Sequence, residues 1–186
     1  MDKYIDTLLT LRLPRWNELP DFELYMDQVI SLMQKYLFSY VLPEEALTPS
    51  MINNYVKMDV LPAPRKKKYN KEHLAKLIVI CLMKKQAPIN AINYVMNEKV
   101  SANGLENFYN SFVNLYESAL QDAANKAKEE NDLLSLALTL SVTASANYIV
   151  AANAVAPAMP NEEKSPSDTH LASSAQTNAV FALEAY

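Results

Sequence analysis

The sequence has a single glycine among its 186 residues, Gly104, and this scarcity excludes several classes of protein. A Walker-type phosphate loop needs two glycines and a dinucleotide-binding turn needs three, because backbone must approach the phosphate closely. Tight hairpin turns also favour glycine. We therefore expect an all-α protein, and neither of these nucleotide-binding motifs.

Histidine and cysteine are almost as scarce, with His73, His170 and Cys81 the only three. Residues so far apart in sequence cannot form a zinc site of the usual Cys/His kind, so we expect no metal and no cofactor. We interpret Cys81 as a small buried apolar residue and His73 as a surface residue in the first turn of a helix.

The sequence also predicts the cellular compartment and whether the protein is an enzyme. One cysteine cannot form a disulfide within the chain, which fits a reducing compartment. The first residues lack a charged segment followed by an apolar run, so we expect no signal peptide and a cytoplasmic protein. No side chains pair as nucleophile and base, so we expect no catalytic residues and no enzyme.

Positive charge is concentrated in residues 46–99. This stretch has ten Lys or Arg against three acidic residues, a net charge of +7, whereas the whole chain carries −4. The segments on both sides are therefore acidic. A compact basic segment of this kind is typical of proteins that bind a polyanion.

Apolar spacing and capping residues predict several helices. Apolar residues recur at helical spacing from Phe22 to Tyr40, and the proline after Leu42 should end that helix. Thr48 and Pro49 then begin a short helix, which should end near Asp59 because Asp tolerates a left-handed backbone.

Further along, Asn70 should cap a helix that reaches Lys85, and a short helix should start near Pro88. Long helices are predicted beyond Gly104. A last helix is predicted from about His170.

The segment between the second and third predicted helices is extended and basic. Prolines keep residues 60–64 extended, and Arg65–Lys68 and Tyr69 follow. A short polar helix, a basic strip and an apolar helix are the parts of a winged helix-turn-helix, in that order. Helix N-termini and lysines favour phosphate, and asparagine can bond adenine edges in the major groove.

Residues 13–96 resemble the DNA-binding domain of the MerR family. The match to its recognition helix, its leucine–proline turn and its wing is carried by Ile52, Tyr55, Leu61, Pro62, Arg65, Tyr69 and Leu74. The following Ala87–Ile92 is similar to the start of that family's next helix. The chain is closer still to a bacterial YkrK-like family of unknown function, through Leu13–Trp16, Glu18–Asp21, Leu47–Val56 and Lys68-Tyr69.

The resemblance implies double-stranded DNA as partner and a second helix that lies in the major groove. The implied DNA-binding residues are Thr48, Ser50, Asn53, Asn54, Tyr55, Lys57, Arg65, Lys66, Lys67, Lys68, Tyr69 and Lys71. Asn53 stands where the family has arginine, Asn54 where it has tyrosine, and Asp59 where it has glycine. Tyr55 lies on the apolar side with Ile52, so a core role is an equal alternative to a phosphate contact.

The stretch Leu133–Ala156 contains no charged residue. Its length could span a bilayer, but aromatic and basic anchors are missing at its far end, so we expect no membrane. A helix apolar on nearly all sides must be covered, and we predict a buried helix of a bundle or a dimer interface.

These observations predict a MerR-like winged helix-turn-helix region over residues 1–100 and a helical dimerisation or effector region over 101–186. The predicted function is a sequence-specific transcriptional regulator that forms a homodimer. A small-molecule effector pocket is suggested at Phe108, Phe112 and Tyr116.

Two alternatives remain open. One is a helical protein-interaction module whose basic patch is covered by the acidic residues 100–186. The other is a small-molecule-binding protein that does not bind DNA.

Overall fold

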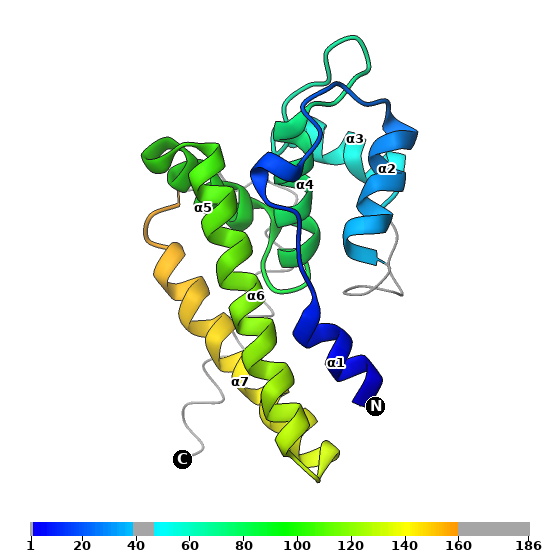
Figure 1. Ribbon diagram of the computed structural model, residues 1–186. Coiled ribbons are helices and arrows are strands. Elements are labelled where there is room, and N and C mark those ends of the chain that lie inside the picture. The colour runs from blue at the N-terminus through cyan, green and yellow to red at the C-terminus, as the bar shows by residue number, and fades with distance from the viewer. Residues whose placement is uncertain (1, 39–46, 160–186) are drawn as a thin grey trace.

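The computed structural model describes residues 2–38 and 47–159, and these are mostly helical (Figure 1). The predicted all-α class is confirmed, because the described residues contain two isolated β-bridges and no longer strand. The elements are α1 (Asp2–Thr10), the 3₁₀ turn η1 (Trp16–Glu18), α2 (Met26–Met33) with its π-helical extension η2 (Gln34–Phe38), α3 (Pro49–Lys57), α4 (Lys71–Met83), α5 (Ile89–Asn103), α6 (Leu105–Glu129) and α7 (Leu133–Val155).

Helix α3 begins and ends where its sequence predicts. The Thr48 hydroxyl accepts a hydrogen bond from the Met51 N–H at 3.3 Å, and Pro49 occupies the first position. At the other end Asp59 has φ 56°, and the Val60 N–H reaches back to the Tyr55 carbonyl at 2.9 Å. Asp59 thus takes the left-handed position that ends many helices.

Helix α4 is the central helix of the core. The Asn70 side chain caps it by accepting from the His73 N–H, as predicted. From Leu74 to Leu82 every residue except Lys76 is buried, and Cys81 is among them. A helix covered on all sides needs packing partners around it, and α2, α5 and α6 supply them.

Two helices differ from their predicted extents. The helix predicted from Phe22 starts at Met26, because residues 21–25 are not helical and Leu24 pairs with Tyr69 through the backbone. The helix predicted as short after Pro88 is α5, which has 15 residues. It ends at Asn103, and Gly104, whose φ is 77°, separates it from α6.

Some predicted features lie outside the described residues. These are the end, at Leu42, of the helix predicted from Phe22 and the helix predicted from about His170.

The N-terminal segment is held to α6 by one buried carboxylate, that of Glu117. Its oxygens accept from the Leu13 N–H at 2.7 Å, from Arg15 Nη2 at 2.7 Å and from Arg12 Nη1 at 3.0 Å. Nearby, the buried Tyr109 hydroxyl donates to the Pro14 carbonyl at 2.8 Å. Helix α1 packs along α6 on the same side of the molecule (Figure 1).

The predicted burial of the uncharged segment is wrong within the described part of the chain. Helix α7 runs back along α6 (Figure 1), and contacts α6 and α5 with one face only. None of its residues is buried, and Leu134, Leu138 and Val150 are largely exposed. Its apolar character therefore serves no core of the described residues, and a dimer interface stays a prediction.

The carboxylate of Glu117 should set the acid stability of the fold. Burial raises the pKa of Glu117, but the hydrogen bonds from Leu13, Arg15 and Arg12 outweigh it, so the pKa lies below its usual value. Because the pKa of Glu117 is lower in the folded than in the unfolded state, its ionisation stabilises the fold at pH values above the unfolded pKa of about 4.3. This stabilisation is lost as the pH falls through the pKa of the folded state.

We expect Glu117→Gln to lower the free energy of unfolding by about 3 kcal/mol at pH 7, because it leaves Arg15 poorly paired. Urea titrations followed by circular dichroism measure the effect, and the loss should shrink below pH 4. Asp6→Asn is the matched control, since its pair with Lys128 is exposed on both sides and should be worth less than about 1 kcal/mol. Equal effects of the two variants would contradict this role of Glu117.

Candidate nucleic-acid interface

The basic strip Arg65–Lys68 forms a hairpin with a two-residue turn, which projects beyond α2, α3 and α4 at one end of the molecule (Figure 1). Arg65 and Lys68 form an antiparallel bridge, and the Lys68 N–H donates to the Arg65 carbonyl at 2.9 Å. Lys66 and Lys67 form the turn between them. Arg65, Lys66 and Lys67 are exposed, so the tip presents three cationic side chains to solvent.

The turn has an unfavourable backbone for its residues. Lys66 has φ 51° and Lys67 has φ 63°. Two successive positive φ values are the requirement of a type I′ hairpin turn, where Asn and Gly are preferred. Each residue with a side chain costs about 1–2 kcal/mol in this region. The strain is tolerated where surrounding contacts hold the turn, and such residues cluster at functional sites.

The base of the hairpin is fixed to the segment before α2. Leu24 and Tyr69 exchange two backbone hydrogen bonds, each 2.8 Å long. The Tyr69 side chain is 3% exposed and packs in the core, so it is not presented to a phosphate. Burial also raises the pKa of Tyr69, which keeps its hydroxyl neutral.

His73 ties the start of α4 to the chain that leads into the hairpin. Its Nε2 lies 3.2 Å from the Pro62 carbonyl, its Nδ1 lies 3.1 Å from the Asn70 N–H, and its ring meets that of Tyr69 edge-on at 5.2 Å. The residue is 4% exposed, so the predicted surface position is wrong. Its partners come from an earlier segment, which helical spacing does not show.

Helix α3 presents most of its predicted site residues to solvent. Thr48, Ser50, Asn53, Asn54 and Lys57 are exposed. Ile52, on the opposite side of the helix, is completely buried and anchors α3 in the core. Tyr55 is half-buried and packs against the core, which agrees with the core role given as its alternative.

Two of the predicted cations have partners within the protein. Lys68 Nζ lies 3.8 Å from a Glu23 carboxylate oxygen and 5.4 Å from the Tyr25 ring centre. Lys71 Nζ lies 5.7 Å from the Trp16 ring centre. These neighbours were not identified from the sequence, because they come from a segment more than 40 residues away.

The three aromatic residues of the suggested effector pocket form a ladder on α6. Phe108 and Phe112 have ring centres 6.3 Å apart, and Phe112 stacks on Tyr116 at 6.2 Å. All three are half-buried and pack against the core. An effector at these residues stays a prediction.

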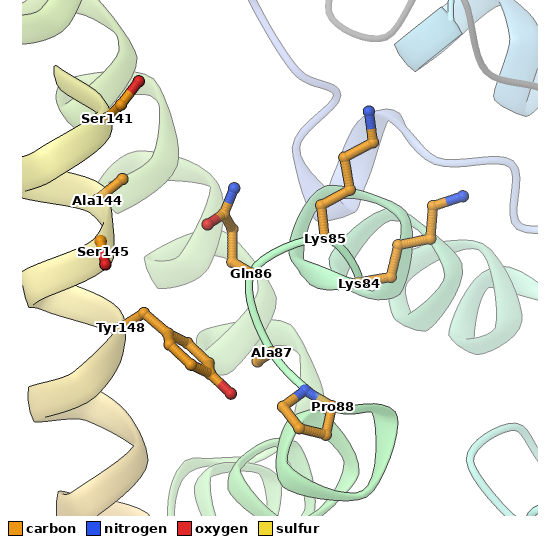
Figure 2. Close-up of a pocket in the computed structure, with 9 residues that line it drawn as sticks. All are labelled: Lys84, Lys85, Gln86, Ala87, Pro88, Ser141, Ala144, Ser145 and Tyr148. Carbon is orange, nitrogen blue, oxygen red and sulfur yellow. The ribbon is translucent and has the colours of Figure 1, made fainter. Parts of the chain in front are cut away.

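A shallow pocket of about 540 Å³ lies elsewhere, between the α4–α5 connection and α7 (Figure 2). It is lined by Lys84–Pro88 and by Ser141, Ala144, Ser145 and Tyr148. Figure 2 shows Tyr148 directed toward Ala87 and Pro88, whereas the side chains of Lys84 and Lys85 extend away from α7.

In residues 2–38 and 47–159, no group of three or more His, Cys, Asp or Glu is placed to hold a metal ion.

The fold and its exposed features define a helical protein with a basic hairpin and a neighbouring polar helix. The chain belongs to the DUF1836 family, described as a domain of unknown function, whose profile matches residues 14–119, more than half of the sequence. That match ends within α6 and leaves α7 outside. No curated protein and no solved structure matches this chain.

The turn geometry predicts that relieving the strain stabilises the protein. The double substitution Lys66→Asn with Lys67→Gly should raise the free energy of unfolding by about 1–2 kcal/mol, because Asn-Gly suits a type I′ turn. Thermal unfolding followed by circular dichroism measures it. Lys66→Ala with Lys67→Ala removes the same charges but keeps the strain, and should give no such gain; a gain of equal size would attribute the effect to charge alone.

His73 predicts a second pH window. Burial lowers the pKa of His73, although the Pro62 hydrogen bond opposes this. As the pH falls, the imidazole is therefore protonated at a higher pH in the unfolded state than in the folded state. The free energy of unfolding then falls as the pH drops below about 6.5. His73→Gln should cost about 1–2 kcal/mol at pH 7.5 and flatten this fall between pH 7 and 5.5. Glu117→Gln is the control, because it should leave the pH dependence between pH 7 and 5.5 unchanged and alter it only at more acidic pH. An unchanged slope in His73→Gln would contradict the assignment.

Proposed function

We propose that this protein binds duplex DNA through the hairpin and α3, and that it is a sequence-specific transcriptional regulator. The observation that carries the proposal is the turn of Lys66 and Lys67, whose side chains are exposed and whose backbone has positive φ. A turn of Asn and Gly would fold more easily, so two lysines there point to a role for their charge. Phosphate is the partner that a projecting cluster of three cations suits best.

The order of elements supports a winged helix-turn-helix arrangement of the MerR type. Helices α2 and α3 precede the hairpin, and Leu24 adds a backbone pair at its base. In such proteins the second helix enters the major groove, and its side chains contact base edges. Asn53 and Asn54, on the exposed side of α3, are suited to bond adenine edges. Thr48, Ser50 and Lys57 are suited to contact the adjoining phosphates of the DNA.

Exposure of the cationic tip favours this function over a protein-interaction module. That alternative requires the acidic region to cover the basic patch. In the part of the chain that the structure describes, residues 100–159 leave Arg65, Lys66 and Lys67 open to solvent. Lys68 and Lys71, which have partners of their own, contribute to the local potential rather than to direct phosphate contacts.

The salt dependence of binding tests the role of the hairpin. Fluorescence anisotropy with a labelled mixed-sequence duplex should show affinity that falls steeply with salt. In Lys66→Asn with Lys67→Gly the turn is kept and two charges are lost. The slope of log K against log salt should then decrease by about 2, since each phosphate contact contributes roughly 0.9.

Lys126→Asn with Lys128→Asn is the matched control, because it changes the net charge equally in the last turn of α6. That end of α6 lies at the opposite end of the molecule from the hairpin (Figure 1). An equal loss in both double variants would indicate a net-charge effect and sink the proposal. Asn53→Ala should alter the sequences selected from a random duplex pool, whereas the exposed Asn125→Ala should not.

A further inference from the structure

Helix α7 leaves an apolar face uncovered. Half-buried Leu136, Leu140 and Val155 lie on the side that faces the protein, together with the pocket-lining Ala144 and Tyr148. Leu138, Val142 and Ile149 follow at spacings of four and seven residues, so they share the opposite side. They are 66%, 59% and 57% exposed, and Leu134 and Val150 on the flanks of that side are 83% and 70% exposed. We call these five residues the outer face of α7.

The outer face exposes five large apolar side chains on an uncharged helix. Twenty of the 23 residues of α7 are exposed, and the helix carries no charge. Soluble monomers rarely expose contiguous apolar patches of more than a few hundred Å². The apolar side chains of the outer face extend from Leu134 to Val150, over most of the 23-residue helix, so the surface that a partner would cover is long.

We infer that the occupant of the outer face is a second copy of this chain, paired through α7 about a two-fold axis. An uncharged helix selects an uncharged partner, because charged groups would be desolvated without compensation. Its own copy offers such a surface of the same length, and a two-fold interface brings the same patch together from both subunits.

Three polar side chains of α7 already make hydrogen bonds to groups nearby in the sequence, which lowers the cost of burying them in such a pair. The Thr143 hydroxyl donates to the Thr139 carbonyl at 2.8 Å, and the Asn153 amide donates to the Ile149 carbonyl at 2.8 Å. At the start of the helix the Ser135 hydroxyl donates to Asp132 at 2.7 Å. These donors are satisfied within the helix, so a partner need not supply acceptors for them.

A lipid bilayer is the main competitor, since α7 is long and apolar enough to cross a membrane, with a mean hydropathy of 1.6. The flanking residues do not favour it. The residues just before the helix are mainly acidic, namely Glu129, Glu130 and Asp132, and no basic residue lies between Lys128 and the helix. Helices that span a membrane also place aromatic residues at the two interfaces. The single aromatic residue of α7, Tyr148, turns toward Ala87 and Pro88 instead (Figure 2).

Sedimentation velocity of the whole chain without DNA tests the pair independently of the proposed function. We expect a dimer at micromolar concentration. Val142→Glu should raise the dissociation constant at least 100-fold while the circular dichroism spectrum stays the same. Leu115→Glu is the matched control, because Leu115 is a 71% exposed apolar residue on α6, and this variant should remain dimeric.

Cross-linking provides a second readout that needs no disruptive substitution. Val142 lies near the middle of α7, so in a two-fold pair it lies close to its own copy whether the helices run parallel or antiparallel. Val142→Cys should form a disulfide-linked dimer under mild oxidation. The unsubstituted chain should not, because its Cys81 is buried.

A monomeric chain at 50 µM without cross-linking of Val142→Cys overturns the inference. Flotation with phosphatidylethanolamine–phosphatidylglycerol vesicles then separates two causes. Co-flotation that Val142→Glu abolishes assigns the outer face to a membrane. A monomer that does not float assigns its cover to another part of the same chain. Loss of DNA binding in a chain that still sediments as a dimer would count against the proposed function alone.

Discussion

The exposed basic hairpin depends on one interaction, the pair of backbone hydrogen bonds between Leu24 and Tyr69. These bonds join the segment before α2 to the base of the hairpin, and the buried Tyr69 ring holds that base in the core. The turn of Lys66 and Lys67 has a backbone that lysine does not favour. It keeps this geometry because both sides of its base are fixed, so the strained tip draws its stability from the core beneath it.

A second anchor, Glu117, connects the N-terminal segment to α6 and completes the support. Leu13 and Arg15 donate hydrogen bonds to its carboxylate. The backbone N–H of the next residue, Trp16, donates to the Asn110 side chain, and the Trp16 ring lies near Lys71 Nζ. The family match, residues 14–119, starts within this segment and ends shortly after Glu117. Arg15, Glu117 and the hairpin thus lie within the matched residues, whereas Leu13 comes just before them and α7 lies beyond them.

Helix α7 therefore has a different physical status from the other helices. Helices α2 to α6 each contribute buried residues to one apolar cluster, whereas α7 contributes none and presents apolar side chains outward. Water does not favour such a surface, and its lack of charge limits what can cover it. A DNA-binding protein that pairs in this way would place two hairpins about one axis, which suits a palindromic site.

The sequence by itself determined the local features of this protein: the helical class, the caps at Thr48 and Asn70, the left-handed Asp59 and the basic segment. Caps and helical spacing act within a few residues, so they can be recognised without knowledge of the fold. Only the tertiary structure decided that Tyr69 and His73 are buried, that a hairpin forms without glycine, and that one side of α7 is exposed to solvent. Those outcomes depend on contacts between distant segments, such as Leu24 with Tyr69, and the spacing of apolar residues does not specify which segments meet.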